Sequence, residues 1–312
     1  MTLGVALSGG SVRGMSHIGA LRALEEEGLK PDMVAGTSAG SIVASLYATG
    51  MSLGCMEEAV LKHARHMIDF DLSGMLAAVM KIGPLFKGYP VIDGLVKGNR
   101  IESIMRKLTE EKKMSQANIP LAITATDVID GGAVVFVSSK KYKPYASGVT
   151  YYHDVLIAEA VRASIAIPVI FRPKMIEVNG KGRRLIDGGV VNNLPIDVLK
   201  SMGARKIIGI NLGYSGDRQE GVDNIIEIGN QSIDIMTYHI TKLRNRLENV
   251  IELVFNGKPV FYPFRINQEA VVVNPQIFDI SIFDYRRIPE CIERGYTSMK
   301  QNLPEVRKIL RI

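Results

Sequence analysis

The sequence predicts an α/β fold with three layers, in which a central, mostly parallel sheet has helices on both faces. Two observations indicate this class. A short apolar strand, a glycine-containing turn and an apolar helix follow one another twice within residues 1–50, and strands that alternate with helices form parallel sheets. The 312 residues are 46% hydrophobic and 22% charged, which is a globular composition long enough to bury a core.

The first strand-turn-helix unit begins close to the start of the chain. Residues 3–7 form a short apolar run typical of a buried strand, and the glycine-rich turn SGGSVRG follows at 8–14. Apolar residues then recur at helical spacing through 15–27, and Gly28 ends this helix.

The second unit has the same order on a smaller scale. Residues 33–35 are a short apolar strand, the turn around Ser38 follows, and small and apolar residues at 39–48 indicate a helix. Two such units in sequence place two parallel strands side by side, with each turn at the carboxyl end of its strand.

The rest of the chain continues the pattern less regularly. We expect a single domain over 1–312, with a catalytic core at about 1–215 and a C-terminal extension of helix and strands at about 216–312 packed on it. Residues 52–113 indicate irregular helix broken by glycines. Further strands are expected at 121–125, 133–138, 184–186, 206–211 and within 251–285, and helices at 154–164, 195–202, 225–250 and 288–310.

Charge and cysteine content narrow the class of protein. A net charge of +6 is too small and dispersed to indicate nucleic-acid binding. The two cysteines form no metal-ligand pattern, and we expect neither metal nor cofactor.

The N-terminus is a poor signal peptide and no apolar run reaches the ~18 residues of a membrane span. We therefore expect a soluble, cytoplasmic protein, peripheral at a membrane if it contacts one.

The turn GTSAG at 36–40 places one serine between two glycines, after a strand and before a helix. A serine in this position is often a nucleophile held on a tight turn. The alternative is a plain turn with Ser38 as the N-cap of the helix.

The earlier glycine turn, at 8–14, can supply backbone N–H groups at a helix N-terminus, where either a phosphate or a reaction oxyanion binds. A dinucleotide site is disfavoured because Ser11 replaces the third glycine of its motif, and a P-loop lacks its Gly-Lys-Ser/Thr. An oxyanion hole is the better interpretation.

The base for Ser38 has several candidates. Ser38, Asp187 and His239 have the chain order of an α/β-hydrolase triad, but His239 lies inside a long amphipathic helical pattern. Asp187 ends a short strand and precedes two glycines, so that another loop can approach it. Desolvation would raise its pKa and let it act as the base. With Asp187 as the base, the pH–rate profile should show an acidic limb and none near the histidine value of ~6.5.

The order SGGSVRG, GTSAG, DGG resembles the patatin-like phospholipases, which use a Ser-Asp dyad without histidine. The segments 159–173, 185–204 and 280–299 also resemble this family, the last its bacterial members. The resemblance implies the patatin-like three-layer fold and a lipid acyl hydrolase. It also implies a role for each matching residue. These are Ser38 as nucleophile, Asp187 as general base, the amides of Gly9, Gly10 and Ser11 as the oxyanion hole, and Arg13, Gly14, Gly36, Gly40, Gly188 and Gly189 as supporting residues. Ser11 stands where the family usually has a third glycine.

The apolar segment 67–86 has two interpretations, a second layer of core or a lid or acyl-chain groove over Ser38. Lys81, Lys87 and Lys97 would suit phospholipid headgroups, which indicates possible peripheral membrane contact through about 67–100.

Together these observations predict a serine esterase that cleaves carboxylic esters of phospholipids or other fatty-acyl lipids, of the phospholipase A or lysophospholipase type, through an acyl-enzyme. Two alternatives remain. The same dyad could serve an acyltransferase or thioesterase, or the chain could be a non-catalytic lipid- or acyl-binding regulator.

Overall fold

The computed structural model of the chain describes residues 2–64, 93–178, 180–214, 225–247, 250–253, 259–260, 269–281 and 284–312. Their strands are β1 (Leu3–Leu7), β2 (Met33–Gly36), β3 (Leu121–Asp127), β4 (Ala133–Val137), β5 (Val149–Tyr152), β6 (Lys174–Val178), β7 (Lys181–Asp187), β8 (Lys206–Ile210), β9 (Ile251–Leu253), β10 (Pro259–Val260) and β11 (Ala270–Val273). Their helices are α1 (Ser16–Glu26), α2 (Ala39–Ala48), α3 (Leu53–His63), α5 (Asn99–Leu108), α6 (Ile157–Ser164), α7 (Ile196–Ser201), α8 (Ile225–Leu247) and α9 (Ile288–Leu310). Short 3₁₀ turns are η1 (Ser11–Met15), η3 (Met114–Gln116), η4 (Gly188–Val190) and η5 (Tyr285–Arg287).

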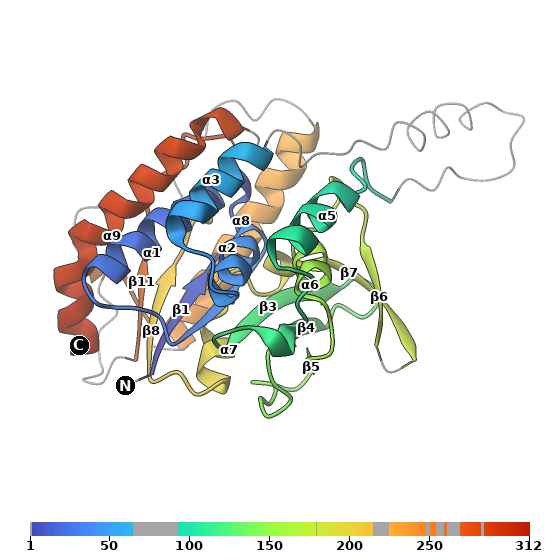
Figure 1. Cartoon of the computed structure of the whole chain (residues 1–312), viewed down its shortest axis with the longest axis horizontal. Coiled ribbons are helices and arrows are strands. Elements are labelled where there is room, and N and C mark those ends of the chain that lie inside the picture. Colours follow the sequence, from blue (N-terminus) through green and yellow to red (C-terminus); the bar gives the residue numbers. More distant parts are fainter. Residues whose placement is uncertain are drawn as a thin grey trace, which may run out of the picture.

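The described strands form one sheet, in the order β10-β9-β11-β8-β1-β2-β3-β4-β5 (Figure 1). Its centre, from β9 to β3, is entirely parallel. In the register of that centre, Val5 lies between Val34 and Ile208. Antiparallel pairing is confined to β10 with β9, β4 with β3, and a hairpin of β6 and β7 that joins β3 through β7. The prediction of a mostly parallel sheet is confirmed.

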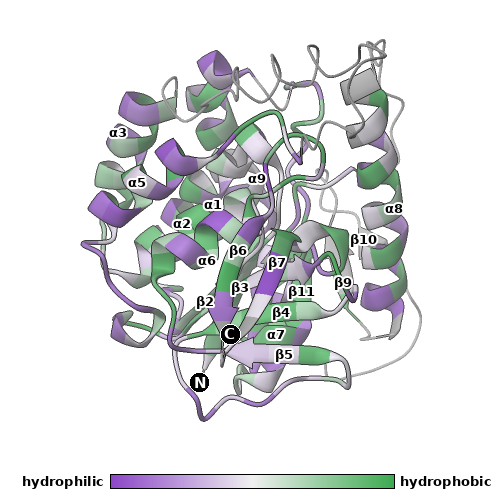
Figure 2. Cartoon of the chain, turned by 90° about the vertical axis from the view of Figure 1, so that its right-hand side faces the viewer, coloured by the Kyte–Doolittle hydropathy of each residue, from purple (hydrophilic) through white to green (hydrophobic). Residues whose placement is uncertain are grey.

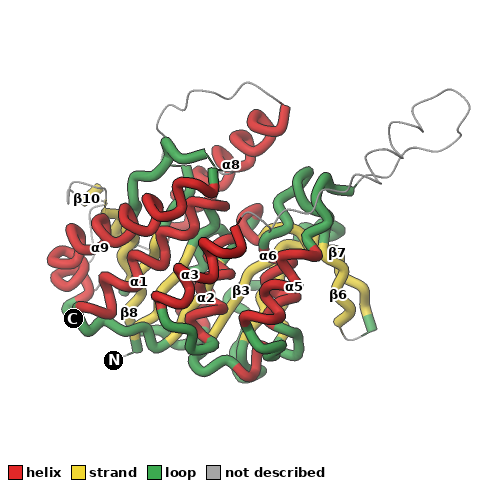
Figure 3. Tube along the Cα trace, turned by 45° about the horizontal axis from the view of Figure 1, so that its top comes forward, coloured by secondary structure: helices red, strands yellow, loops and turns green. Residues whose placement is uncertain are grey.

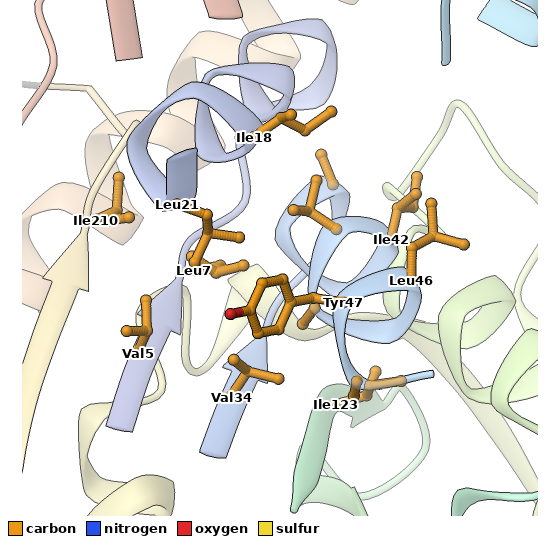
Figure 4. Close-up of a cluster of buried hydrophobic side chains, with 14 of the residues drawn as sticks. Val5, Leu7, Ile18, Leu21, Val34, Ile42, Leu46, Tyr47, Ile123 and Ile210 are labelled. Atoms are coloured by element: carbon orange, nitrogen blue, oxygen red, sulfur yellow. The ribbon is translucent and has the colours of Figure 1, made fainter. Parts of the chain in front are cut away.

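Alternation along the strands separates two cores, because successive side chains of a strand point to opposite faces. Val5 and Leu7 face α1, α2 and α9, whereas Ala6 faces α7. Figure 4 shows the first of these cores, with Leu7 and Val34 of the sheet beneath Ile18 of α1. Figure 3 shows helices gathered over this face, and Figure 2 shows α8 on the side of the sheet opposite α2 and α5. The sheet therefore has helices on both faces, as predicted.

The C-terminal helix is joined to the first helix at two glycines. A Cβ atom on Gly19 would lie 1.8 Å from the carbonyl oxygen of Ile292, and one on Gly295 would lie 2.0 Å from that of Ser16. The backbones of α1 and α9 therefore pack directly on each other at this crossing, and β11 extends the sheet beside β8. On this basis we propose that residues 1–312 form one domain, with the segment after about residue 215 completing the sheet of the core.

The sequence analysis located most elements but missed β5 and β6. Both are only partly buried, so that neither has the continuous apolar run by which β1 was recognised. The helix expected at 154–164 begins only at Ile157, and the one expected at 225–250 ends at Leu247. The segment 67–86, expected as core or lid, lies outside the described residues, as does most of 67–100. Among the helices that the structure describes, none is both long enough and apolar enough to cross a bilayer.

Candidate active site

Ser38 lies on a strained turn between β2 and α2. Its backbone has φ 51° and ψ −125°, a region that a residue with a Cβ atom occupies only at a cost. Its N–H donates to Oγ of Ser164 at 2.8 Å. The residue is 6% exposed. Strain at a single buried polar residue is typical of a functional position, because the surrounding structure must hold it there.

The glycines on either side of Ser38 allow the turn to be this tight. A Cβ atom on Gly36 would lie 2.4 Å from the carbonyl oxygen of Gly40, and one on Gly40 would lie 2.3 Å from that of Leu7. Neither glycine has a positive φ. Close approach of three backbone segments therefore requires glycine here, while the unusual dihedral angles fall on Ser38 itself. Gly14 has a similar part, since a Cβ there would lie 2.3 Å from Cβ of Ala39.

Asp187 ends β7 and faces the serine. Pairing of β7 with β3 fixes its position, opposite Ala125. One carboxylate oxygen, Oδ1, accepts the N–H of Gly189 at 2.7 Å, and the side chain of Ser38 lies near enough to the carboxylate to lower its pKa. A Cβ atom on Gly188 would lie 2.3 Å from Oγ1 of Thr124. The first glycine of the DGG motif thus lets β3 approach the turn.

Burial sets the protonation of Asp187. The side chain is nearly inaccessible, and this desolvation raises its pKa to about 7. The hydrogen bonds from Ser38 and Gly189 oppose the shift, and the negative charge of Asp234 adds to it. A carboxylate with a pKa near neutrality is a far better proton acceptor than one at its ordinary value.

The glycine turn at 8–14 and Asp187 line one cavity. The N–H of Gly9 donates to Oδ1 of Asn193 at 3.1 Å. The N–H of Gly9 therefore already has Asn193 as its partner. The oxyanion hole of Gly9, Gly10 and Ser11 stays a prediction. Ser11 has φ 51°, so it adopts the backbone conformation that the glycine usual at this position would take without strain.

Arg13 ties the turn to the C-terminal part of the chain. Its guanidinium donates to the carbonyl oxygens of Ile280 at 2.7 Å and Phe278 at 3.1 Å, and it lies 5.8 Å from the ring centre of Phe278. Burial lowers the pKa of Arg13, while the charge of Asp234 opposes this. Arg13 thus joins the glycine turn to the backbone of Phe278 and Ile280.

Two cavities meet at Ser38. The first, of about 80 Å³, is the more polar of the two, and we call it the polar cavity. It is bounded by the glycine turn, by Asp187, and by Asp234 and Thr237 of α8. The second, of about 130 Å³, is apolar. The side chains that give the second its apolar character come from η1, α2, α3, α5 and the segment that follows α6, and include Met15, Ile42, Val60, Ile101, Ile165 and Phe171. Ser38 lines both cavities.

The described histidines lie away from these cavities. His17 is fully buried, with Nε2 2.8 Å from the carbonyl oxygen of Ser8, and burial lowers the pKa of His17 to about 4, so that it is neutral. His239 is exposed on α8, with its ring against Tyr238. His63 and His153 are likewise not among the residues lining either cavity. His66 lies outside the described residues.

His239→Ala should leave kcat/KM for a p-nitrophenyl ester within about twofold of the wild-type value, since exposed substitutions outside the site rarely perturb it. The measurement is a steady-state assay of both proteins at several pH values. A loss of several orders of magnitude would restore the Ser-Asp-His triad and contradict the dyad.

Sequence reasoning missed three residues of the site. Asn193 bridges the glycine turn and the DGG turn, Ser164 accepts the N–H of Ser38, and Asp234 adds a second carboxylate. The one local signal was the pair Asn192-Asn193 within an otherwise apolar stretch, where polar side chains need buried partners. Ser164 and Asp234 stand in ordinary helical sequence. Within the described part of the chain, no group of three or more His, Cys, Asp or Glu could hold a metal ion.

A parallel sheet with a strained serine at a strand-to-helix turn, in one cavity with a buried carboxylate, defines an α/β protein built like the serine hydrolases. The family model described as patatin-like phospholipase matches residues 5–200, and the chain belongs to this family.

Curated relatives agree with this membership. Patatin-like phospholipase domain-containing protein 6 of Mus musculus is 31% identical over 216 residues, which are 68% of this chain and 14% of the relative. Lysophospholipase NTE1 of Mycosarcoma maydis is 28% identical over 217 residues, 70% of this chain and 10% of the relative. The chain thus spans only a small part of the length of these proteins.

Solved structures are more distant in sequence. Human GIVD cytosolic phospholipase A2 in complex with methyl gamma-linolenyl fluorophosphonate inhibitor and terbium chloride has a TM-score of 0.49 at 13% identity, covering 99% of this chain and 60% of that chain. The type III effector protein ExoU has a TM-score of 0.47 at 15% identity, covering 98% of this chain and 53% of that chain.

Proposed function

We propose that the chain hydrolyses carboxylic esters of lipids through an acyl-enzyme on Ser38, with Asp187 as the general base. The observation that carries this proposal is that a strained Ser38 lines the same cavity as a carboxylate that burial holds at a pKa of about 7. Membership in a family of phospholipases supports a lipid ester as the substrate.

The first half of the reaction forms the acyl-enzyme. Oγ of Ser38 attacks the ester carbonyl carbon while Asp187 takes the hydroxyl proton. The amides of Gly10 and Ser11 would donate to the oxyanion of the tetrahedral intermediate, a kind of contact worth ~2.7–4 kcal/mol per donor. When the intermediate collapses, the carbon–oxygen bond to the leaving alcohol breaks and Asp187 returns its proton to that alcohol.

The second half releases the fatty acid. Asp187, again ionised, takes a proton from a water molecule, and the resulting hydroxide attacks the acyl carbonyl carbon. Collapse of this second intermediate breaks the bond to Oγ of Ser38 and returns the proton to it. The fatty acid leaves, and the dyad is restored.

The two cavities suggest where the parts of the substrate lie. An acyl chain would gain free energy by entering the apolar cavity, which opens at Ser38 between α2, α3 and α5. The leaving alcohol would then lie in the polar cavity, beside Asp187 and below α8. With this division, the size of the apolar cavity determines which lengths of acyl chain the site accepts.

Ala64→Phe should shift preference toward short chains, because Ala64 lines the apolar cavity and a phenyl ring there would shorten it. We expect the ratio of kcat/KM for long-chain over short-chain p-nitrophenyl esters to fall at least about tenfold. Ala59→Phe, on the same helix but outside the cavity lining, is the matched control. Equal ratios in the two variants would show that the chain binds elsewhere.

The test of the proposed function itself is a lipid panel. The wild-type chain and Ser38→Ala are incubated with phospholipids, lysophospholipids and acylglycerols, and products are identified by mass spectrometry, with alcohols and thiols added in parallel. Free fatty acid formed by the wild type alone is the expected result. Transesterified products in place of fatty acid would assign an acyltransferase or thioesterase, and no product together with no fluorophosphonate labelling of Ser38 would indicate a lipid-binding regulator.

A further inference from the structure

Helix α8 has an apolar outer face that no described element covers. Ile228, Met236 and Leu243 are 53%, 57% and 58% exposed. Their spacing places them on one side of a helix. Ile235 and Ile240, which are 38% and 40% exposed, extend the same side. Figure 2 shows hydrophobic residues along α8 at the edge of the molecule. We call these five residues the outer stripe.

The opposite side of α8 belongs to the candidate active site. Ile233, Asp234 and Thr237 line the polar cavity, and Oγ1 of Thr237 donates to the carbonyl oxygen of Gly189 at 3.2 Å. Near the end of the helix, Arg244 forms an ion pair of 2.8 Å with Asp197. These contacts fix the helix with one side on the site and the outer stripe directed away from it.

Charge distinguishes the possible occupants of the outer stripe. Between residues 235 and 247 the helix contains no Asp or Glu, and its basic residues besides the paired Arg244 are Lys242 and Arg246. Apolar residues combined with basic ones are typical of helices that lie in the headgroup region of an anionic bilayer. A second copy of this chain would bring an equally basic helix against the first, and like charges oppose that pairing.

We infer that the outer stripe of α8 is a docking surface for an anionic lipid bilayer. The inference rests on the proposed function in one respect: a lipid substrate is the reason why binding to a bilayer would serve the protein. A helix that lines the polar cavity with one side and lies on the bilayer with the other keeps that cavity close to the lipid. Lys242 and Arg246 then add electrostatic attraction to the burial of the apolar side chains.

The test is flotation of the full chain with vesicles of phosphatidylcholine, with and without phosphatidylglycerol. The variant is M236E/L243E, which places two charges on the outer stripe. The control is I129E/M175E, because Ile129 and Met175 are 74% and 60% exposed on other parts of the surface. Both variants change the net charge equally. Far-UV circular dichroism and melting temperatures check that each is folded.

We expect the wild type and I129E/M175E to bind phosphatidylglycerol vesicles, more weakly as salt is added. M236E/L243E should lose at least about tenfold in vesicle affinity, while its kcat/KM for a short, water-soluble ester stays unchanged. Equal binding by both variants would overturn the inference. A wild-type chain that does not bind vesicles would also overturn it. If that chain instead forms a dimer that M236E/L243E dissociates, a second copy of the chain covers the outer stripe.

Failure of the docking surface and failure of the proposed function give different results. If docking is wrong, vesicle binding is insensitive to the α8 variant while hydrolysis of the short ester still requires Ser38. If the proposed function is wrong, the wild type and Ser38→Ala hydrolyse that ester equally, whatever the flotation result.

Discussion

Ser38→Ala is expected to abolish ester hydrolysis while leaving the chain folded. Alanine removes the only atom that attacks the ester in the proposed mechanism, and loss of a serine nucleophile commonly costs at least about 10⁴-fold in kcat. The backbone strain at φ 51° is the same with alanine as with serine, so the melting temperature should change little. The measurements are kcat for a short p-nitrophenyl ester and thermal unfolding of both proteins.

Ser38→Gly is the matched control for strain. It should be as inactive as the alanine variant but more stable than it by about 1 kcal/mol, because glycine takes a positive φ without a Cβ clash. A fluorophosphonate should label the wild type and neither variant. If Ser38→Ala keeps more than a few per cent of the wild-type rate, another nucleophile acts and the proposed mechanism fails.

The turns of the site could be located from sequence because their causes are local. Gly36 and Gly40 are required by backbone segments that approach each other at the turn, and they flank Ser38 in the chain. Asp187 is followed at once by Gly188, the residue that β3 approaches. Strand β1 was equally clear, since all its residues are buried and a continuous apolar run results.

Features that depend on distant segments could not be predicted in this way. Ser164 contacts Ser38 from 126 positions away, and Asn193 contacts Gly9 from 184 positions away. Such contacts leave no periodicity or turn signature in the sequence around either partner. The same reason applies to Asp234, whose helical pattern gives no sign that one side of α8 walls a cavity.

The acid–base behaviour was predicted in direction but not in extent. We expected burial to raise the pKa of Asp187 and yet to leave the pH limb outside the histidine range. The structure buries Asp187 so fully that its pKa is about 7. The limb therefore falls where a histidine would titrate, and its position alone does not identify the base. Variants of the carboxylate and of His239 are needed to do so.

Asp187→Asn should be nearly as damaging to hydrolysis as Ser38→Ala. Asparagine keeps the shape of the side chain and can still accept the N–H of Gly189, but it cannot take the proton of Ser38. General-base assistance is commonly worth ~10²–10⁴ in rate, so kcat/KM for a short p-nitrophenyl ester should fall by at least that factor. In the wild type kcat/KM should rise with pH through about 7, as Asp187 ionises, and the variant should lose this limb.

The same substitution should raise stability, in a pH window that identifies the carboxylate. The pKa of Asp187 is raised from 3.8 in the unfolded chain to about 7 in the fold. The protonated carboxyl is therefore tolerated at low pH, and stability is lost as the pH rises from about 4 through about 7. Asparagine carries no charge to bury, so Asp187→Asn should unfold like the wild type at pH 4. At pH 8 it should be more stable, by up to about 4 kcal/mol.

Urea unfolding of both proteins at pH 4 and pH 8 measures this difference, and His239→Ala is the control that should show neither effect. An Asp187→Asn variant within tenfold of the wild-type rate would exclude Asp187 as the base. If Asp187→Asn and the wild type are equally stable at pH 4 and also at pH 8, the carboxylate is not buried as a neutral acid. A limb near 7 that survives Asp187→Asn but disappears in a histidine variant would assign the proton transfer to histidine, and the dyad would then be wrong.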